Sequence, residues 1–142
     1  MLAYPARFAP EPEGGFTVTF RDVPEAVTHG SDLEEAMSMA QDALESVLTD
    51  FVEAKHALPT PSRIKRGERL VELTPLGAAK AAIYETMRTR KIGKAALARM
   101  LNCHLPQIDR LLDFCHQTRW EMVEKALVAL GKRMVVEVKD AA

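Results

Sequence analysis

The sequence predicts an α+β protein in which a small sheet domain is followed by an all-helical domain. Apolar and polar residues alternate with a period of two near the N-terminus, whereas helical spacings of three and four dominate after Thr74. The net charge also differs between the N-terminal and C-terminal parts of the chain. Residues 1–57 hold three bases and eleven acids, a net charge of −8, while residues 58–142 hold sixteen bases and nine acids, a net charge of +7. We therefore expect domains at 1–73 and 74–142.

Two strands joined by a tight turn are expected to open the first domain. Residues 4–8 and 16–20 alternate large apolar side chains with polar ones, which is typical of strands with one buried face. Gly14 and Gly15 lie between them and supply the positive φ angles of a hairpin turn. With further strands expected at 26–28 and 70–73, the predicted order is strand, strand, strand, helix, strand.

A long helix is expected between the third and fourth strands. Ser31-Asp32-Leu33-Glu34 reads as a capping box at its start. One side is predicted to be buried through an apolar stripe of Leu33, Met37, Ala40, Leu44, Val47 and Phe51. The other side is predicted to be solvated and acidic, with Glu34, Glu35, Asp42, Glu45, Asp50 and Glu53.

The second domain is expected to be helical up to Gly131. Thr74-Pro75 is an N-cap followed by proline in the first turn, and two short helices fit residues 94–101 and 105–114. Thr118-Arg119-Trp120-Glu121 reads as a second capping box, which opens a helix with Trp120 facing inward. Residues 134–138 are β-formers and predict a short C-terminal strand, whose apolar character indicates an inter-subunit edge.

Residues 94–112 have the spacing of a helix-turn-helix. Ala98 is small where two helices cross, Asn102 tolerates the left-handed conformation of a tight turn, and Cys103 is a small residue after it. The outward residues of the second helix would then meet the DNA, while a helical hairpin without nucleic-acid relevance is the alternative. The candidate DNA-binding residues are Lys94 for a phosphate, and His104, Leu105, Pro106, Gln107 and Arg110 for the groove.

Two parts of the chain resemble known families. Residues 92–131 resemble the lambda-repressor type of helix-turn-helix, including the Ala-Leu-Gly-Lys ending at 129–132. Residues 4–53 resemble the HicB antitoxin family. The matching stretches are Gly14-Gly15-Phe16-Thr17-Val18-Thr19-Phe20, Asp22-Val23-Pro24-Glu25-Ala26-Val27-Thr28-His29-Gly30 and Leu33-Glu34-Glu35-Ala36.

The HicB resemblance implies a partly degenerate RNase H-like N-terminal domain that neutralises a small mRNA-cleaving toxin of the HicA family. It also implies a C-terminal domain that binds double-stranded operator DNA in the promoter of its own operon. Such domains generally bind a palindromic operator as a two-fold dimer, and whether dimers pair into tetramers is left open. The candidate toxin-binding residues are Asp22, Glu25, Thr28 and His29, with the acidic helix face as the alternative.

Catalysis and metal binding are not expected. RNase H chemistry needs carboxylates that converge on two metal ions, and the strands predicted at 4–8 and 16–20 contain neither Asp nor Glu. The pairs Cys103-His104 and Cys115-His116 are adjacent residues, which point about 100° apart on a helix and are poorly placed to share one ion. We predict no enzymatic activity and no cofactor. The competing function is a stand-alone transcriptional regulator with a ligand-binding α+β domain.

The expected location is the cytoplasm. No apolar run approaches the roughly 20 residues of a membrane helix, and the N-terminal residues lack the apolar region of a signal peptide. Two clustered cysteines fit a reducing compartment better than a disulfide framework.

Overall fold

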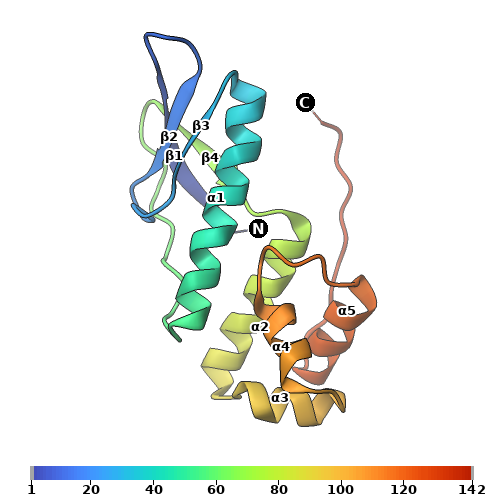
Figure 1. The fold of residues 1–142 in the computed structure, drawn as a ribbon. Helices are drawn as coiled ribbons and strands as arrows, with labels where there is room; N and C mark the ends of the chain where they lie inside the picture. The colour runs from blue at the N-terminus through green and yellow to red at the C-terminus, as the bar shows by residue number, and fades with distance from the viewer. Residues whose placement is uncertain (1, 142) are drawn as a thin grey trace.

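The computed structural model describes residues 2–141 and places a four-stranded sheet with one long helix beside a group of four helices (Figure 1). The predicted α+β class is confirmed. The elements are β1 (Ala3–Pro10), β2 (Phe16–Phe20), β3 (Val27–Gly30), α1 (Leu33–Glu53), β4 (Glu68–Glu72), α2 (Pro75–Arg90), α3 (Lys94–Leu101), α4 (Leu105–Leu112) and α5 (Trp120–Ala129).

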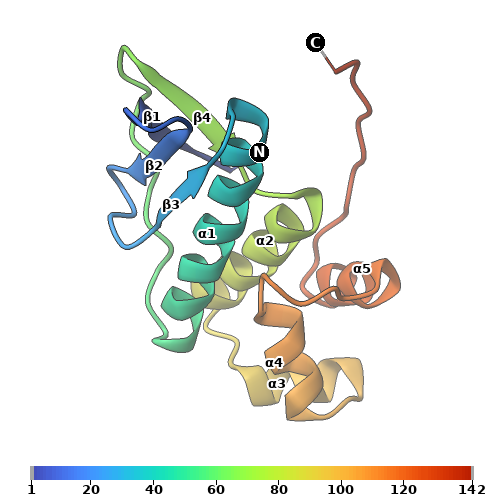
Figure 2. The ribbon, with the colours of Figure 1, turned by 45° about the horizontal axis from the view of Figure 1, so that its top comes forward.

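The sheet is antiparallel throughout, with strand order β3-β2-β1-β4, and α1 covers one of its faces (Figure 2). The second strand lies where the sequence predicts it. The first is longer than predicted because it pairs with neighbours on both sides, and the third and fourth are shifted by one or two residues. Gly14 and Gly15 have φ angles of 102° and 81°, which confirms the predicted hairpin turn.

The N-cap of α1 is Asp32, so the predicted cap at Ser31 is wrong by one residue. Asp32 Oδ1 accepts a hydrogen bond from the Glu35 backbone N–H at 2.8 Å. Glu35 Oε1 in turn accepts one from the Ser31 N–H at 3.3 Å. The cap is therefore a carboxylate rather than a hydroxyl, and it satisfies the Glu35 N–H instead of the Glu34 N–H.

The buried stripe of α1 is also rotated from the prediction. It consists of small and medium residues that let the helix approach the sheet closely, whereas Leu33 is 41% exposed. Glu45, predicted on the solvated side, is buried. The buried apolar residues of the stripe are Ala36, Ala40, Leu44, Leu48 and Val52.

The helices after Thr74 follow the prediction closely, with two corrections. The second short helix ends at Leu112 because Asp113 adopts an extended conformation, and α5 is not capped by Thr118. The N-cap of α5 is Arg119, without a side-chain bond, and Trp120 is 43% exposed rather than inward. Within residues 2–141, none of the helices has the length and apolar character needed to cross a membrane.

The predicted strand at residues 134–138 is not present. This segment is extended and follows α5 without regular structure, although the stop at Gly131 is as predicted, with a φ of 74°. A strand is stabilised by pairing with another, and residues 2–141 of one copy place no strand beside this segment.

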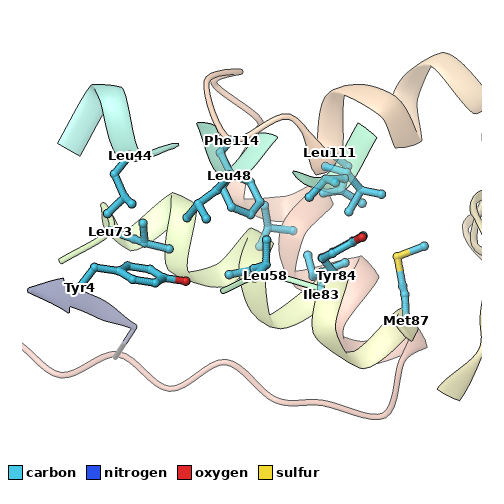
Figure 3. Close-up of a cluster of buried hydrophobic side chains, with 14 of the residues drawn as sticks. Tyr4, Leu44, Leu48, Leu58, Leu73, Ile83, Tyr84, Met87, Leu111 and Phe114 are labelled. Atoms are coloured by element: carbon cyan, nitrogen blue, oxygen red, sulfur yellow. The ribbon is translucent and has the colours of Figure 1, made fainter. Parts of the chain in front are cut away.

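Buried side chains join the two parts of the chain in one continuous cluster (Figure 3). We call residues 2–73 the sheet unit and residues 74–141 the helical unit. Leu48 on α1 lies near Phe114, which follows α4. The division into two domains therefore remains a prediction, because buried contacts cross it. The labelled members of the cluster are Tyr4, Leu44, Leu48, Leu58, Leu73, Ile83, Tyr84, Met87, Leu111 and Phe114.

Candidate functional site

The two structural units carry net charges of opposite sign. The difference between them is smaller than that between residues 1–57 and 58–142. Strand β4 and the basic segment before it belong to the sheet unit. Residues 1–73 therefore hold seven bases and thirteen acids, a net charge of −6, and residues 74–142 hold twelve bases and seven acids, a net charge of +5. The sheet unit is suited to a basic partner and the helical unit to an anionic one.

Helices α3 and α4 meet through a tight turn whose residues match the predicted roles. Asn102 has φ 51° and ψ 51°, the left-handed conformation that the turn requires. The Cys103 N–H donates to the Ala98 carbonyl oxygen at 2.9 Å, which closes the end of α3. Ile108 and Leu111 are buried, so the opposite side of α4 is left exposed.

The candidate residues of α4 lie together on that exposed side. His104 is the N-cap, and its backbone N–H donates to Gln107 Oε1 at 2.9 Å. The carbonyl oxygen of Gln107 therefore holds the start of the helix, while its amide NH₂ group is left for another acceptor. Leu105, Pro106 and Arg110 are also exposed, and Arg110 lies one turn after Gln107.

Lys94 is engaged in an ion pair that the sequence did not reveal. Its Nζ lies 2.7 Å from Asp109 Oδ1, and the pair links the start of α3 to the middle of α4. Both side chains are partly exposed, and exposed ion pairs contribute about 0–1 kcal/mol. A phosphate can therefore compete with Asp109 for this ammonium group.

Lys80 is a functional candidate that sequence reasoning missed. It is fully buried on α2, and its Nζ donates to the carbonyl oxygens of Arg110 (3.1 Å), Asp113 (2.7 Å) and His116 (2.8 Å). It also donates to Thr118 Oγ1 at 2.8 Å. The last carbonyls of a helix lack intrahelical partners and carry partial negative charge. Lys80 therefore fixes the C-terminal end of α4 against α2.

The charge of Lys80 is compatible with this role. Burial lowers the pKa of the Lys80 ammonium group to about 8, so it is mostly protonated at neutral pH. Position 80 lies three residues after Gly77 and four before Tyr84, both buried on the same helix, but the structure and not the sequence shows that burial. A search for apolar stripes does not count a lysine, so Lys80 was not identified as buried.

Polar groups of α1 also cross to the helical unit. Glu45 Oε2 accepts hydrogen bonds from the Thr74 N–H (2.9 Å) and the Thr74 hydroxyl (2.8 Å). A Cβ atom at Gly77 would lie 2.0 Å from this carboxylate oxygen, so a larger residue there would displace the Glu45 carboxylate from Thr74. Thr49 Oγ1 accepts a bond from the Phe114 N–H at 3.1 Å. These contacts place the start of α2 and the end of the α4 segment on α1.

The four toxin-binding candidates of the sheet unit do not form a single surface. Both carboxylate oxygens of Asp22 are engaged by Ser62, through its N–H at 2.7 Å and its hydroxyl at 2.6 Å, which lowers the Asp22 pKa. Glu25 is exposed beside Asp50, near the C-terminal end of α1. Thr28 is half-buried and the adjacent His29 is exposed on β3.

His29 lies at the other end of α1 from Glu25. It lines a hollow of about 710 Å³ with Glu11, Glu13 and Ser31, at the tip of the β1–β2 hairpin. The alternative surface, the acidic face of α1, retains its exposed carboxylates except Glu45. No group of three or more His, Cys, Asp or Glu side chains within the part of the chain that the structure describes is arranged to hold a metal ion.

Comparisons with known proteins identify relatives over nearly the whole length of the chain. Residues 3–82 match the family model of HicB-like antitoxins of bacterial toxin–antitoxin systems. The antitoxin HicB 2 of Photorhabdus laumondii is 38% identical over 94% of each chain. The antitoxin HicB of Pseudomonas fluorescens is 35% identical over 99% of this chain and 97% of its own. The antitoxin HicB of Escherichia coli K12 is 33% identical over 94% of this chain and 96% of its own.

Proposed function

Because the chain belongs to the HicB-like antitoxins of bacterial toxin–antitoxin systems, we propose that it binds and inhibits a HicA-type mRNA-cleaving toxin. We further propose that it represses its own operon by binding the promoter. The observation that carries the first part is the family match across the sheet unit. The pairing of α3 with an exposed, partly basic α4 supports the second.

The proposed DNA interface is a helix-turn-helix formed by α3 and α4, with α4 entering the major groove. Arg110 and Gln107 have side chains that can contact guanine and adenine edges, respectively. Lys94 at the start of α3 is the proposed phosphate contact, once it is released from Asp109. The net charge of +5 on residues 74–142 supports attraction to the DNA backbone. A homodimer would present two such helices to a palindromic operator, and tetramers remain open.

The proposed toxin interface lies on the sheet unit, whose net charge of −6 complements the basic surface that an RNA-cutting protein needs. Its proposed contacts are Glu25 near the C-terminal end of α1 and, as a separate patch, Thr28 and His29 on β3; the exposed acids of α1 are the alternative. Asp22 would act indirectly, since its carboxylate holds Ser62. Inhibition would be by binding alone, without chemistry performed by this chain.

Co-expression with a HicA-type toxin, which we expect the neighbouring open reading frame to encode, tests the proposal. The full-length chain should co-purify with the toxin and abolish its cleavage of mRNA in vitro. Charge reversal separates the two surfaces: Glu25→Lys should weaken the complex about tenfold if the β3 end is the interface, and Asp42→Lys should do so if the α1 face is. A chain that binds operator DNA and leaves the toxin active would instead fit a stand-alone transcriptional regulator.

A further inference from the structure

The segment after α5, residues 131–141, is an extended tail with an unusual apolar exposure. Val135, Val136 and Val138 are 75%, 74% and 90% exposed. Among the backbone hydrogen bonds within residues 2–141, none involves residues 133–141. Figures 1 and 2 both show the tail running away from α5 as an extended segment. A row of β-branched residues with unpaired N–H and C=O groups is a template for strand pairing.

The tail borders an apolar groove of about 830 Å³. The outer face of α2 lines the groove with Ala78, Ala79 and Ala82 at its middle and with Pro75, Glu85 and Thr86 toward its ends, so a chain segment can approach the helix backbone most closely at the three alanines. Trp120, which is 43% exposed, lines the same groove from α5. Met134 is partly buried against the core, so the side of the tail that carries Met134 faces the body of the protein.

We propose that two copies of the chain dimerise by pairing their tails as an antiparallel two-stranded ribbon, with Val135 on the two-fold axis. This inference rests on the proposed function, because the tail would form the interface of the proposed DNA-binding homodimer. Strands that meet across a two-fold axis perpendicular to them are necessarily antiparallel, and every contact then occurs twice.

The charges of the tail select this register. With Val135 opposite Val135 of the partner subunit, Arg133 lies opposite Glu137 of the partner subunit, and Met134 lies opposite Val136 of the partner subunit. Opposite charges and apolar residues are thus paired throughout residues 133–137. Moving the axis to Val136 would place Arg133 opposite Lys139 of the partner subunit, and like charges directly opposite are destabilising. The tail is self-complementary in the first register.

The same register gives the ribbon one apolar and one polar face. Side chains alternate along a strand, so Met134, Val136 and Val138 share a face, and Arg133 and Glu137 share the other with Val135. Residues of both faces line the groove, but Met134 of the first face is the one that packs partly buried against the core. Pairing would thus place two copies of Met134 and Val136 over the alanines of α2 and Trp120, and leave the ion pairs in solvent.

Charge reversal in the full-length protein tests the register. Arg133→Glu and Glu137→Arg should each weaken dimerisation about tenfold in sedimentation equilibrium, because each places like charges opposite twice. The double variant should restore the parent dissociation constant. Lys139→Glu, which changes a charge in the tail opposite Gly131, is the matched control and should have little effect. A dimer that is insensitive to both single reversals, or a chain that stays monomeric, would overturn the proposal.

A cysteine cross-link tests the position of the axis. In a Cys115→Ser background, Val135→Cys should form a covalent dimer on mild oxidation, because the two sulfurs face each other. Val136→Cys faces Met134 of the partner subunit and should cross-link far less. Equal cross-linking at both positions contradicts the register. Both readouts are independent of DNA, so an intact tail dimer that fails to bind the operator would count against the proposed function alone.

Discussion

The sheet unit and the helical unit differ in charge and architecture, yet they share one core. The former carries a net charge of −6 and the latter +5, which favours different partners for each. Between them, Glu45 and Thr49 of α1 bond to Thr74 and Phe114, and Leu48 lies in the shared apolar cluster. The surfaces are therefore separable by mutation, whereas the units are expected to fold together.

Breaking the shared core should have the largest effect. Leu48→Ala removes a fully buried side chain next to Phe114 and should lower the free energy of unfolding by roughly 2–5 kcal/mol. Because the core crosses both units, Trp120 fluorescence and far-ultraviolet circular dichroism should report one coincident transition in denaturant.

Leu33→Ala is the matched control for this prediction. Leu33 is a leucine on the same helix that is 41% exposed, and its truncation should cost well under about 1 kcal/mol. Separate transitions for the two probes would mean that the units fold independently, and the shared core would then not couple them.

Replacement of Lys80 should come next in size and should affect the helical unit more than the sheet unit. Lys80→Met leaves the carbonyl oxygens of Arg110, Asp113 and His116 without their buried donor, which should cost roughly 1–3 kcal/mol. We expect operator affinity to fall while toxin inhibition persists. Lys91→Met, at the exposed end of the same helix, should leave stability nearly unchanged.

The pH dependence of stability offers a second readout for Lys80. Its pKa is about 8 in the fold and 10.5 in the unfolded chain, so the unfolded chain binds more protons between these values. The ionisation of Lys80 should make the free energy of unfolding rise with pH from about 8 to 10.5, and this increment should be lost as the pH falls back through 8. A Lys80→Met variant with the same slope in this window would contradict the assignment.

The smallest stability effect is expected at the exposed pair of Lys94 and Asp109, about 0–1 kcal/mol. Its effect on DNA should be clearer. Lys94→Ala should weaken operator and random DNA equally and reduce the salt slope by about one per half-site. Asp109→Asn should strengthen binding to both, because it frees Lys94 and removes a negative charge from α4. Band shifts at two salt concentrations measure this, and unchanged affinity in both variants would remove Lys94 from the interface.

Local signals explain what the sequence predicted well. The turn at Asn102, the hairpin glycines and the short helices depend on neighbours within a few residues, and their positions match the prediction except that α4 ends two residues early. The stripe of α1 was predicted correctly at Ala40 and Leu44, but packing on the sheet buries Ala36 and Leu48 rather than Leu33. That choice depends on the distance between helix and sheet, which no local pattern contains.

Long-range polar contacts could not be predicted from the sequence. Lys80 is separated from its acceptors by 30–38 residues, and Glu45 from Thr74 by 29. A buried lysine or glutamate looks like a surface residue until its partners are known. Asp22 shows the opposite error. It was predicted to contact the toxin, but its carboxylate is hydrogen-bonded to Ser62, 40 residues away.

The operator preference of Arg110→Ala tests most directly the claim that the two functions occupy separate surfaces. Arg110 is exposed on α4, and loss of a bidentate base contact costs about 1–3 kcal/mol per half-site. We predict that the variant loses about that much of its preference for the operator over random DNA, at one base pair per half-site, and still inhibits the toxin fully. Arg66→Ala, an exposed arginine of the sheet unit, should keep the preference. Unchanged operator preference in Arg110→Ala would contradict the placement of α4 in the groove.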